Sequence, residues 1–435
     1  MRTLPFRHSG AGLSIAVLVR ACSPSQAFLR FGVMNMNERR VLISGASIAG
    51  LACAYWLRRH GFSVTIVEIA PSPRPGGQAV DLRGAGRTVI DRMGLLNGAR
   101  AIGLEQAGMS WVDAHGQTRA AMPTDAFGGE GFISEIEILR GDLVDLLYQQ
   151  LGDGIEWIFN DTITELAQSS NYVNVTFRGA RPQRFDFVIG ADGLHSAVRT
   201  AAFGREEDFV HPLGLYTAWF TAPAFEELDN WYQLYNHTGG LVASIRPGSQ
   251  PSESKAALSF RTRPGERVGH DRRDRASQIA LLEDRFGGVG WHVPRLLEAA
   301  RSASDFSFDE MGKVQLSRWW NGRIALIGDA AACPTPLSGL GTSVALVGAY
   351  VLAGELGDGS DHAAAFAAYD RLVRPYVEGA QQLAGGPGGY APMTALAIRF
   401  MQASMSWATR WPMRGFMEKQ FSKASDIDLP DYTPA

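Results

Sequence analysis

The stretch from Arg39 to Glu68 constrains the fold more than any other part of the sequence. It runs through an apolar segment, RRVLISG, a helix-forming segment, ASIAGLACAYWLRRHG, and a second apolar segment, FSVTIVE. Apolar runs that are continuous rather than alternating are typical of parallel strands buried on both faces. The pattern therefore predicts a strand–helix–strand unit, in which Gly61 ends the helix.

Small residues fill the turn between the first strand and the helix. Gly45 permits a tight turn, Ser47 leaves room for a pyrophosphate to approach the backbone, and Gly50 lets the helix pack on the strand. Glu68 ends the second strand, where it can accept hydrogen bonds from a ribose hydroxyl and would repel the 2′-phosphate of NADP. The turn predicts dinucleotide binding but does not distinguish FAD from NAD, and a purely structural tight turn remains the alternative. The residues expected at the dinucleotide are Gly45, Ser47, Ile48, Ala49, Gly50 and Glu68.

Two later segments place an aspartate at the end of an apolar strand. In FDFVIGADGLHSAVR the acid is Asp192, and in GRIALIGDAAACPTPLSGLGTSVALVGAYVLAGEL it is Asp329. An acid beside a helix N-terminus can accept hydrogen bonds from a polyol such as a ribityl chain, and PLSGLG offers backbone N–H groups to the pyrimidine edge of an isoalloxazine. Either aspartate alone is equally well explained as a helix N-cap. Both together, behind the first unit, favour a flavin.

These three motifs, in this order, resemble the group A flavoprotein monooxygenases, the p-hydroxybenzoate hydroxylase-like family. The resemblance covers residues 38 to about 385, and the segment GGQAVDLRG is most similar to the tetracycline-modifying branch. It implies that Asp81 and Arg83 face the isoalloxazine and the active site, and that Arg140, in ILRGDLVDLL, lies along the cofactor. The further cofactor contacts that the resemblance implies are Asp192, Gly328, Asp329, Pro336, Gly339, Leu340, Gly341 and Thr342.

The resemblance also implies a reaction. NAD(P)H binds transiently, reduces FAD and leaves, which fits the lack of a second glycine-rich unit. A flavin C4a-hydroperoxide then transfers one oxygen atom from O2 to a small aromatic or polyketide-type substrate. Ala332 stands where the family often has a histidine, and the following helix lacks the usual Asn and Asp, so no proton donor is assigned.

Two alternative functions remain open on the same scaffold. One is a flavin-dependent halogenase or reductase, of which the halogenase is disfavoured because the sequence has no Trp-x-Trp-x-Ile stretch. The other is a flavin-binding protein without oxygenase activity, for which the departures at Ala332 and in the following helix leave room. Reduction of the bound flavin by NADPH distinguishes it from an enzyme.

Composition restricts the partners. The net charge of −3 comes without a basic stripe, which argues against nucleic acid, and the three cysteines show neither disulfide nor metal-site spacing. We expect a cytoplasmic monomer or homodimer with no metal and no membrane partner. Residues 1–36 are basic with a short apolar run, and we interpret them as a leader or as a start codon assigned too far upstream, ahead of Met34 and Met36.

The expected architecture is α/β: a three-layer, Rossmann-like FAD-binding domain, an interleaved β-sheet substrate domain and a C-terminal helix. We assign 37–110, 135–204 and 316–385 to the first, 111–134 and 205–315 to the second, and 386–435 to the helical tail. LYTAWFTAP, WYQLYN and LVASIRP are expected strands, and GSQPSESKAA an expected loop. Aromatic side chains there line a pocket or pack in the sheet; they are Trp219, Phe220, Trp231, Tyr232 and Tyr235. The tail, MTALAIRFMQASMSWATRWPMRGFMEKQF, is expected to be an amphipathic helix that caps the active site or forms a dimer contact.

Overall fold

The computed structural model of the chain describes residues 39–432, apart from 75, 129–130, 132–133, 226–227, 264, 267, 269–273, 360, 383–385, 409, 411–413, 416–417 and 419–426. The leader or upstream start expected at 1–36 lies outside the described residues. Residues 39 onward form one compact unit.

A six-stranded sheet forms the centre of the first half of this unit. Its order is β17-β18-β11-β1-β2-β7, and every neighbouring pair is parallel except β17 with β18. The strand–helix–strand unit is present, because α1 connects β1 to β2. The strands are β1 (Arg40–Ser44), β2 (Ser63–Glu68), β7 (Glu156–Phe159), β11 (Phe187–Gly190), β17 (Trp320–Asn321) and β18 (Ile324–Leu326).

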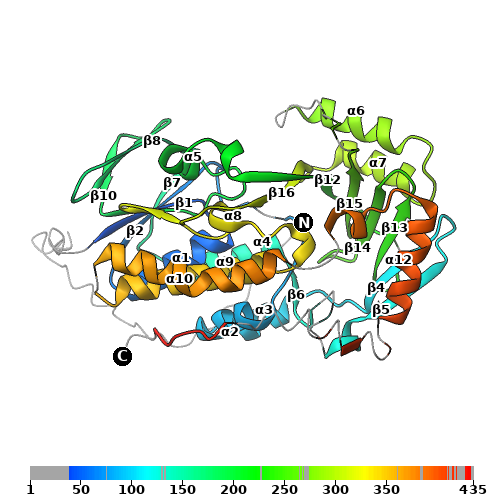
Figure 1. The fold of residues 1–435 in the computed structure, drawn as a ribbon, viewed down its shortest axis with the longest axis horizontal. Coiled ribbons are helices and arrows are strands. Elements are labelled where there is room, and N and C mark those ends of the chain that lie inside the picture. Colours follow the sequence, from blue (N-terminus) through cyan, green and yellow to red (C-terminus); the bar gives the residue numbers. More distant parts are fainter. Residues whose placement is uncertain are drawn as a thin grey trace, which may run out of the picture. The chain divides into compact units, whose positions relative to one another are not determined.

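Helices and a small second sheet cover the two faces of this sheet (Figure 1). One face carries α1 (Ile48–Arg59), α9 (Gly341–Gly357) and α10 (His362–Gln381), with α4 (Arg140–Leu151) against α1. The other carries α5 (Ala197–Phe203) and the antiparallel strands β8 (Ile163–Gln168), β9 (Val173–Phe177) and β10 (Gln183–Phe185). The three-layer, Rossmann-like arrangement predicted from the sequence is confirmed.

A seven-stranded sheet, ordered β16-β12-β15-β14-β13-β4-β5, forms the second half. Its strands come from separated parts of the sequence, as expected for an interleaved domain: β4 (Gly108–Val112), β5 (Thr118–Pro123), β12 (Val210–Pro223), β13 (Trp231–His237), β14 (Leu241–Pro247), β15 (Glu253–Arg261) and β16 (Ser307–Val314). Helices α6 (Arg275–Phe286) and α7 (Val293–Ser302) pack on one face, and α12 (Ala395–Trp407) lies against the other (Figure 1).

The remaining elements are short. They are β3 (Ala79–Asp81), α2 (Gly84–Arg92), α3 (Leu96–Ala101), η1 (Thr124–Phe127), β6 (Glu137–Leu139), η2 (Glu206–Asp208), α8 (Asp329–Ala332), η4 (Pro336–Ser338) and α11 (Gly386–Tyr390). None of the helices among the described residues is long and apolar enough to cross a bilayer.

One expectation about local structure is wrong in part. The segment GSQPSESKAA was expected to be a loop, but its second half belongs to β15. Its polar residues are tolerated in a buried strand because they have partners: the Lys255 ammonium donates to the Thr221 hydroxyl at 2.7 Å and lies 3.9 Å from the Asp305 carboxylate. The expected tail helix is present as α12, Ala395–Trp407, and most of the segment expected to continue it lies outside the described residues.

Candidate active site

The turn after β1 depends on two glycines. Gly45 has φ +106°, and its N–H donates to the Val67 carbonyl at 2.8 Å. A Cβ on Gly45 would lie 2.5 Å from the Ala191 carbonyl oxygen, and a Cβ on Gly50 would lie 1.9 Å from the Gly45 carbonyl oxygen. Both contacts are with backbone, which has little freedom to move. The tight turn and the close packing predicted from the sequence are therefore present.

The N-terminus of α1 points its backbone donors out of this turn. Ser47 is the N-cap residue, but its side chain makes no capping hydrogen bond, and the first turn contains no acidic residue. The first N–H groups of a helix lack intrahelical acceptors, and the helix dipole favours negative charge at that end. The cap position and the first turn, which includes Ile48 and Ala49, are thus suited to an anion such as a pyrophosphate.

Glu68 ties the end of β2 to the glycine turn. One carboxylate oxygen accepts from the Ala46 N–H at 2.8 Å, and the other accepts from the Ala70 N–H at 2.9 Å. The side chain is buried. Glu68 therefore holds the turn in place, and its expected contact with a ribose hydroxyl remains a prediction.

Asp192 lies at the N-terminus of α5, four residues before the N-cap residue, Ser196. Its carboxylate accepts hydrogen bonds from the Ser196 hydroxyl at 2.5 Å, from the Ala197 N–H at 3.0 Å and from the Ser44 hydroxyl at 3.2 Å. Burial raises the pKa of this carboxyl, while the hydrogen bond from Ser196 opposes the rise. The sequence left an N-cap role open for Asp192, but the N-cap residue is Ser196, and Asp192 instead accepts from the first N–H groups of the helix. Because Ser44 ends β1, the same carboxylate also links the second motif to the first.

Asp329 is placed differently. It begins α8 directly after β18, and its side chain is exposed to solvent although the backbone around it is buried. The protein packed about the carboxyl raises its pKa, and a hydrogen bond with the Cys333 thiol partly counters this rise. The Asp329 carboxylate is thus held from one side by a thiol and remains accessible to a ligand.

The loop between α8 and α9 exposes a second helix N-terminus. Gly339 has φ +65°, and α9 begins at Gly341 with no acidic residue in its first turn and no side-chain cap. A Cβ on Gly341 would meet no atom within 4 Å, so there is open space in front of the helix start. Pro336, Leu340 and Thr342 complete the turn. Its first N–H groups can bind an electron-rich edge of a ring.

Asp81 and Arg83 lie beside this loop. Their side chains form an ion pair at 2.8 Å, and a Cβ on Gly339 would lie 3.2 Å from the Asp81 carboxylate. Two backbone groups hold the pair: the Ser134 N–H donates to Asp81 at 2.9 Å, and Arg83 donates to the Gly131 carbonyl at 2.8 Å. Because Arg83 is only 3% exposed, its guanidinium has a fixed position next to the loop.

Arg140 lies at the other end of the candidate site. It begins α4, and a Cβ on Gly77 would lie 2.7 Å from its guanidinium Nε. Burial and the positive charge of Arg74 lower the pKa of Arg140, whereas the negative charge of Glu68 raises it. Arg140 therefore lies in the electrostatic field of the acid that ends β2, as expected for a residue that runs along a bound dinucleotide.

Close contacts join the three motifs at one edge of the six-stranded sheet. Gly45 abuts Ala191, as described above, and a Cβ on Gly328 would lie 3.0 Å from the Ala49 Cβ. The fully buried Arg199 donates to the Ala330 carbonyl at 3.1 Å, which links the second motif to the third. The residues present fit FAD as a cofactor. The site has the features that FAD requires, namely two uncapped helix N-termini, one accessible carboxylate and glycines without room for a side chain.

Sequence reasoning missed a buried ion pair next to this site. Arg246 on β14 and Glu137 on β6 form a salt bridge in which both side chains are buried, and the Arg246 guanidinium lies 3.8 Å from the Tyr232 ring centroid. Burial raises the pKa of Glu137 to about 7, although the charge of Arg246 opposes this and that of Asp81 supports it. The only sequence signal was an arginine inside the apolar run LVASIRP, where an unpaired charge would be costly.

The aromatic residues of the large sheet divide between its faces. Trp219 and Tyr232 belong to the cluster on the side of α12, together with Leu234 and Val242. Phe220 and Tyr235 lie in the core beneath α6 and α7, so for these two the alternative of packing in the sheet is confirmed. Side chains alternate between the faces of a strand, and this alternation separates neighbours such as Trp219 and Phe220.

Several known proteins are similar to this chain over most of its length. The profile of the FAD binding domain family matches residues 38–383. The chain belongs to the group A FAD-dependent monooxygenase family. A flavin-dependent monooxygenase from an unknown prokaryotic organism is 38% identical over 91% of this chain and 100% of its own length, and an uncharacterized protein of Mycobacterium tuberculosis is 46% identical over 81% and 94%. The crystal structure of tetracycline destructase Tet(55), at 36% identity, matches with a TM-score of 0.75 over 91% of this chain and 99% of that one.

Membership in the monooxygenase family confirms FAD as the cofactor and the fold predicted from the sequence. It leaves the role of each residue to be tested, since the contacts described above are those of the protein chain alone. The residues that the motifs single out for the flavin are nevertheless gathered along one edge of the sheet by direct contacts.

Proposed function

We propose that this chain uses NAD(P)H and O2 to hydroxylate a small aromatic or polyketide-type molecule. The observation that carries the proposal is the Asp81–Arg83 ion pair beside Gly339, because it brings the segment that resembles the tetracycline-modifying branch to the loop expected to border the flavin ring. The likeness to a tetracycline destructase supports a polycyclic substrate.

Each of the three motifs would bind a different part of FAD. The α1 N-terminus would hold the pyrophosphate and Glu68 the ribose, while the accessible Asp329 carboxylate would accept hydrogen bonds from the ribityl hydroxyls. The N–H groups at Gly341 and Thr342 would face the pyrimidine edge of the ring, where the α9 dipole stabilises negative charge. Bound FAD supplies the electron transfer and oxygen activation that protein side chains cannot.

Arg83 and Asp81 would fix the electrostatics at the ring. A guanidinium that is bonded to Asp81 and to the Gly131 carbonyl cannot swing away, so its charge is preorganised. Asp81 in turn is oriented by the Ser134 N–H. Together they would hold a substrate oxygen close to the ring and keep water out of this corner of the site.

The face of the seven-stranded sheet on the side of α12 would cover the substrate. Alongside Trp219 and Tyr232 it carries hydroxyl groups: the Thr217 and Ser259 hydroxyls are 2.9 Å apart, and Ser259 lies 3.3 Å from the Tyr390 hydroxyl. Aromatic surface with a few fixed polar groups is the usual lining of a site for a flat, oxygenated molecule.

Oxygen consumption tests the proposal. The FAD-loaded protein is given NADPH or NADH and a panel of phenols, naphthoquinones and tetracycline-like compounds in an oxygen electrode. We expect one or more compounds to raise oxygen uptake and to gain one oxygen atom by mass spectrometry. Under anaerobic conditions the yellow flavin should bleach with the nicotinamide. A flavin that never bleaches would instead favour a flavin-binding protein without oxygenase activity.

A variant separates the ring-facing pair from cofactor binding. Arg83→Met keeps much of the side-chain length but removes the charge, so FAD content should stay near that of the wild type while substrate-stimulated oxygen uptake falls about 10-fold or more. Arg301→Met is the matched control, since Arg301 pairs with Glu283 on the outer helices. Equal uptake in the two variants would remove Arg83 from the reaction.

A further inference from the structure

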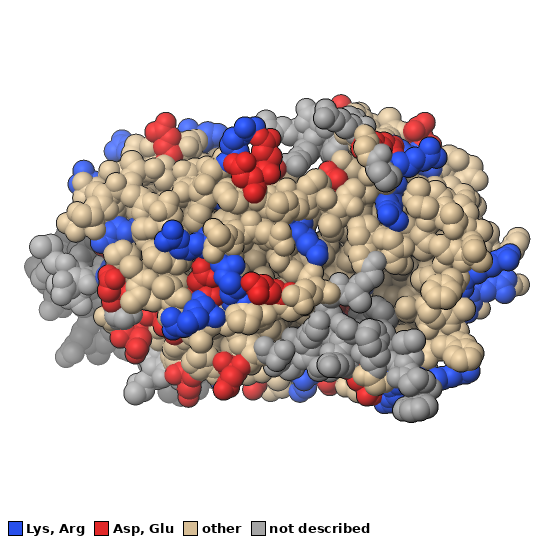
Figure 2. Space-filling view, in the orientation of Figure 1, with Lys and Arg blue, Asp and Glu red and all other residues tan. Residues whose placement is uncertain are grey.

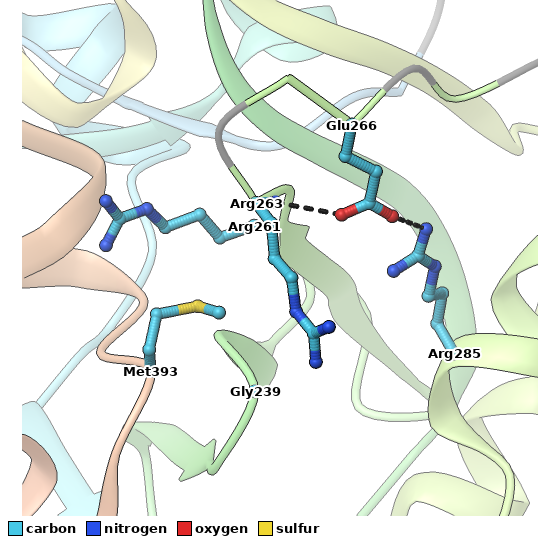
Figure 3. A pocket seen from close by; sticks show the side chains of 6 residues that line it. All are labelled: Gly239, Arg261, Arg263, Glu266, Arg285 and Met393. Atoms are coloured by element: carbon cyan, nitrogen blue, oxygen red, sulfur yellow. Dashed lines mark hydrogen bonds and ion pairs between the residues drawn. The ribbon is translucent and has the colours of Figure 1, made fainter.

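A cavity of about 380 Å³ lies at one end of the seven-stranded sheet, among residues to which no function has been given above. Four separate segments line it: the turn between β13 and β14, the end of β15 and the residues that follow, helix α6, and the residues just before α12 (Figure 3). The lining residues are Gly239, Arg261, Arg263, Glu266, Arg285 and Met393.

The one acid in this lining is already engaged. The Glu266 carboxylate accepts from the Arg263 backbone N–H at 2.8 Å and forms an ion pair with Arg285 (Figure 3). These hydrogen bonds lower the pKa of Glu266, so it stays ionised near neutral pH. Arg285 is held further by the Phe260 ring, whose centroid lies 5.0 Å from the guanidinium carbon. The charges of Glu266 and Arg285 therefore offset each other.

Among the described residues, no carboxylate forms an ion pair with the guanidinium of Arg261 or Arg263, although the positive charge of Arg263 helps to lower the pKa of Glu266. The buried cations of the same sheet, Arg246 and Lys255, are both paired. Three arginines and one glutamate leave a net charge of +2 in the lining. Figure 3 shows the two side chains diverging from the end of β15, that of Arg261 above Met393 and that of Arg263 toward Gly239.

The segments around the cavity are packed closely enough to hold its shape. A Cβ on Gly240 would lie 2.8 Å from both the Arg261 Cβ and the Met393 sulfur, and a Cβ on Gly388 would lie 3.3 Å from the Arg261 guanidinium. Arg261 also follows Ser259 by two positions on β15, so the two side chains share a face of the strand. The cavity therefore adjoins the face of the sheet that is proposed to cover the substrate.

We propose that this cavity binds the oxyanion of an organic ligand, with Arg261 and Arg263 as its charged partners. Guanidinium groups bind carboxylates and phosphates through charge-assisted, often bidentate hydrogen bonds, and a methionine side chain adapts to the apolar body of a ligand. A carboxylated aromatic substrate and the 2′-phosphate of NADPH both supply such a group. Oxyanion binding stands by itself, and only the identity of the ligand rests on the proposed function.

Calorimetric titration of the FAD-loaded protein tests binding with two matched pairs of probes. The pair 1-hydroxy-2-naphthoate and 1-naphthol differs by a carboxylate, and the pair adenosine 2′-monophosphate and adenosine differs by a phosphate. We expect the charged member of at least one pair to bind more tightly than its neutral partner. A response to the first pair alone identifies a substrate group, and a response to the second alone identifies the nicotinamide cofactor. Equal binding within both pairs overturns the proposal.

Two variants with opposite expected effects sharpen the test. Arg263→Gln should weaken binding of the charged probe about 10-fold without changing that of the neutral one. Glu266→Gln should tighten it, because Arg285 is released to the cavity. Arg301→Gln removes one charge elsewhere in the same domain and should leave both probes unaffected. If Arg263→Gln and Arg301→Gln behave alike, the site is not the one described.

FAD content and melting temperature establish that each variant is folded. Because the titration needs no turnover, a protein that binds the charged probe but shows no substrate-stimulated oxygen uptake would refute the proposed hydroxylation and leave the oxyanion site intact. The reverse result would refute the oxyanion site alone.

Discussion

Replacing Gly50 by alanine tests the contact that holds α1 against β1. The new Cβ would lie 1.9 Å from the Gly45 carbonyl oxygen, whereas real Cβ atoms essentially never approach closer than 3.0 Å, so the helix start must move by about 1.1 Å (3.0 − 1.9). Overpacking of this kind costs about 1–3 kcal/mol. The greater helix propensity of alanine offsets up to about 1 kcal/mol of this destabilisation. Taking the upper end of the first range, the net destabilisation is about 2 kcal/mol (3 − 1).

Gly379→Ala is the matched control. Gly379 lies in α10, and a Cβ there would meet no atom within 4 Å, so the substitution brings the helix-propensity gain of about 1 kcal/mol without a clash. The two variants should therefore differ in the free energy of unfolding by about 3 kcal/mol, with opposite signs relative to the wild type. Urea unfolding of the FAD-free proteins measures this difference.

The same shift should weaken FAD binding in Gly50→Ala, because it displaces the helix N–H groups expected to hold the pyrophosphate. The ratio of flavin absorbance to protein absorbance in the purified variants measures this effect, and Gly379→Ala should match the wild type. If Gly50→Ala gained stability like Gly379→Ala and kept its flavin, the close contact would not be what requires a glycine at this position.

Three further predictions concern the other charged groups of the site. Asp329→Ala should fold normally but lose FAD, by about 10-fold or more in affinity measured by fluorescence titration, and full flavin occupancy would remove Asp329 from the ribityl site. Arg246→Met leaves Glu137 buried without its partner and should cost about 3–5 kcal/mol in urea unfolding, whereas adding Glu137→Gln should restore much of that loss; additive losses would refute the pairing. The folded pKa of Glu137, about 7, exceeds its ordinary 4.5, so between these values the folded protein holds a proton that the unfolded chain has released. The free energy of unfolding should therefore fall as pH rises from 4.5 to 7. Urea midpoints measured across that range test this. In Glu137→Gln, the part of the pH dependence that is due to Glu137 should disappear.

Local patterns were sufficient to predict the flavin-binding half. Each of its motifs joins a continuous apolar strand to a turn that contains small residues or an aspartate. The residue types that such a turn requires lie within a few positions of one another in the sequence. The positive φ of Gly45 and the hydrogen bond from the Ala197 N–H to Asp192 are of this kind. Parallel strands then bring their carboxyl ends to the same edge of the sheet without further information.

The substrate-binding half was less predictable because its polar residues find partners far away in the sequence. Lys255 lies in a buried strand because the carboxylates of Glu253 and Asp305 offset its charge and the Thr221 hydroxyl accepts its hydrogen bond. Of these partners only Glu253 is near it in the chain. The segment GSQPSESKAA therefore appeared to be a loop. Likewise, the alternation that separates Trp219 from Phe220 becomes informative only once the positions of α7 and α12 are known.

The Glu137–Arg246 pair shows how the two halves are coupled. Glu137 lies on β6, which pairs with β3, the strand that ends at Asp81, while Arg246 lies on β14 of the large sheet. A shift of the large sheet relative to the flavin-binding half would therefore either break a buried ion pair or displace the strand that carries Asp81. Because breaking such a pair costs several kcal/mol, the pair opposes independent movement of the large sheet and the strands that carry Asp81.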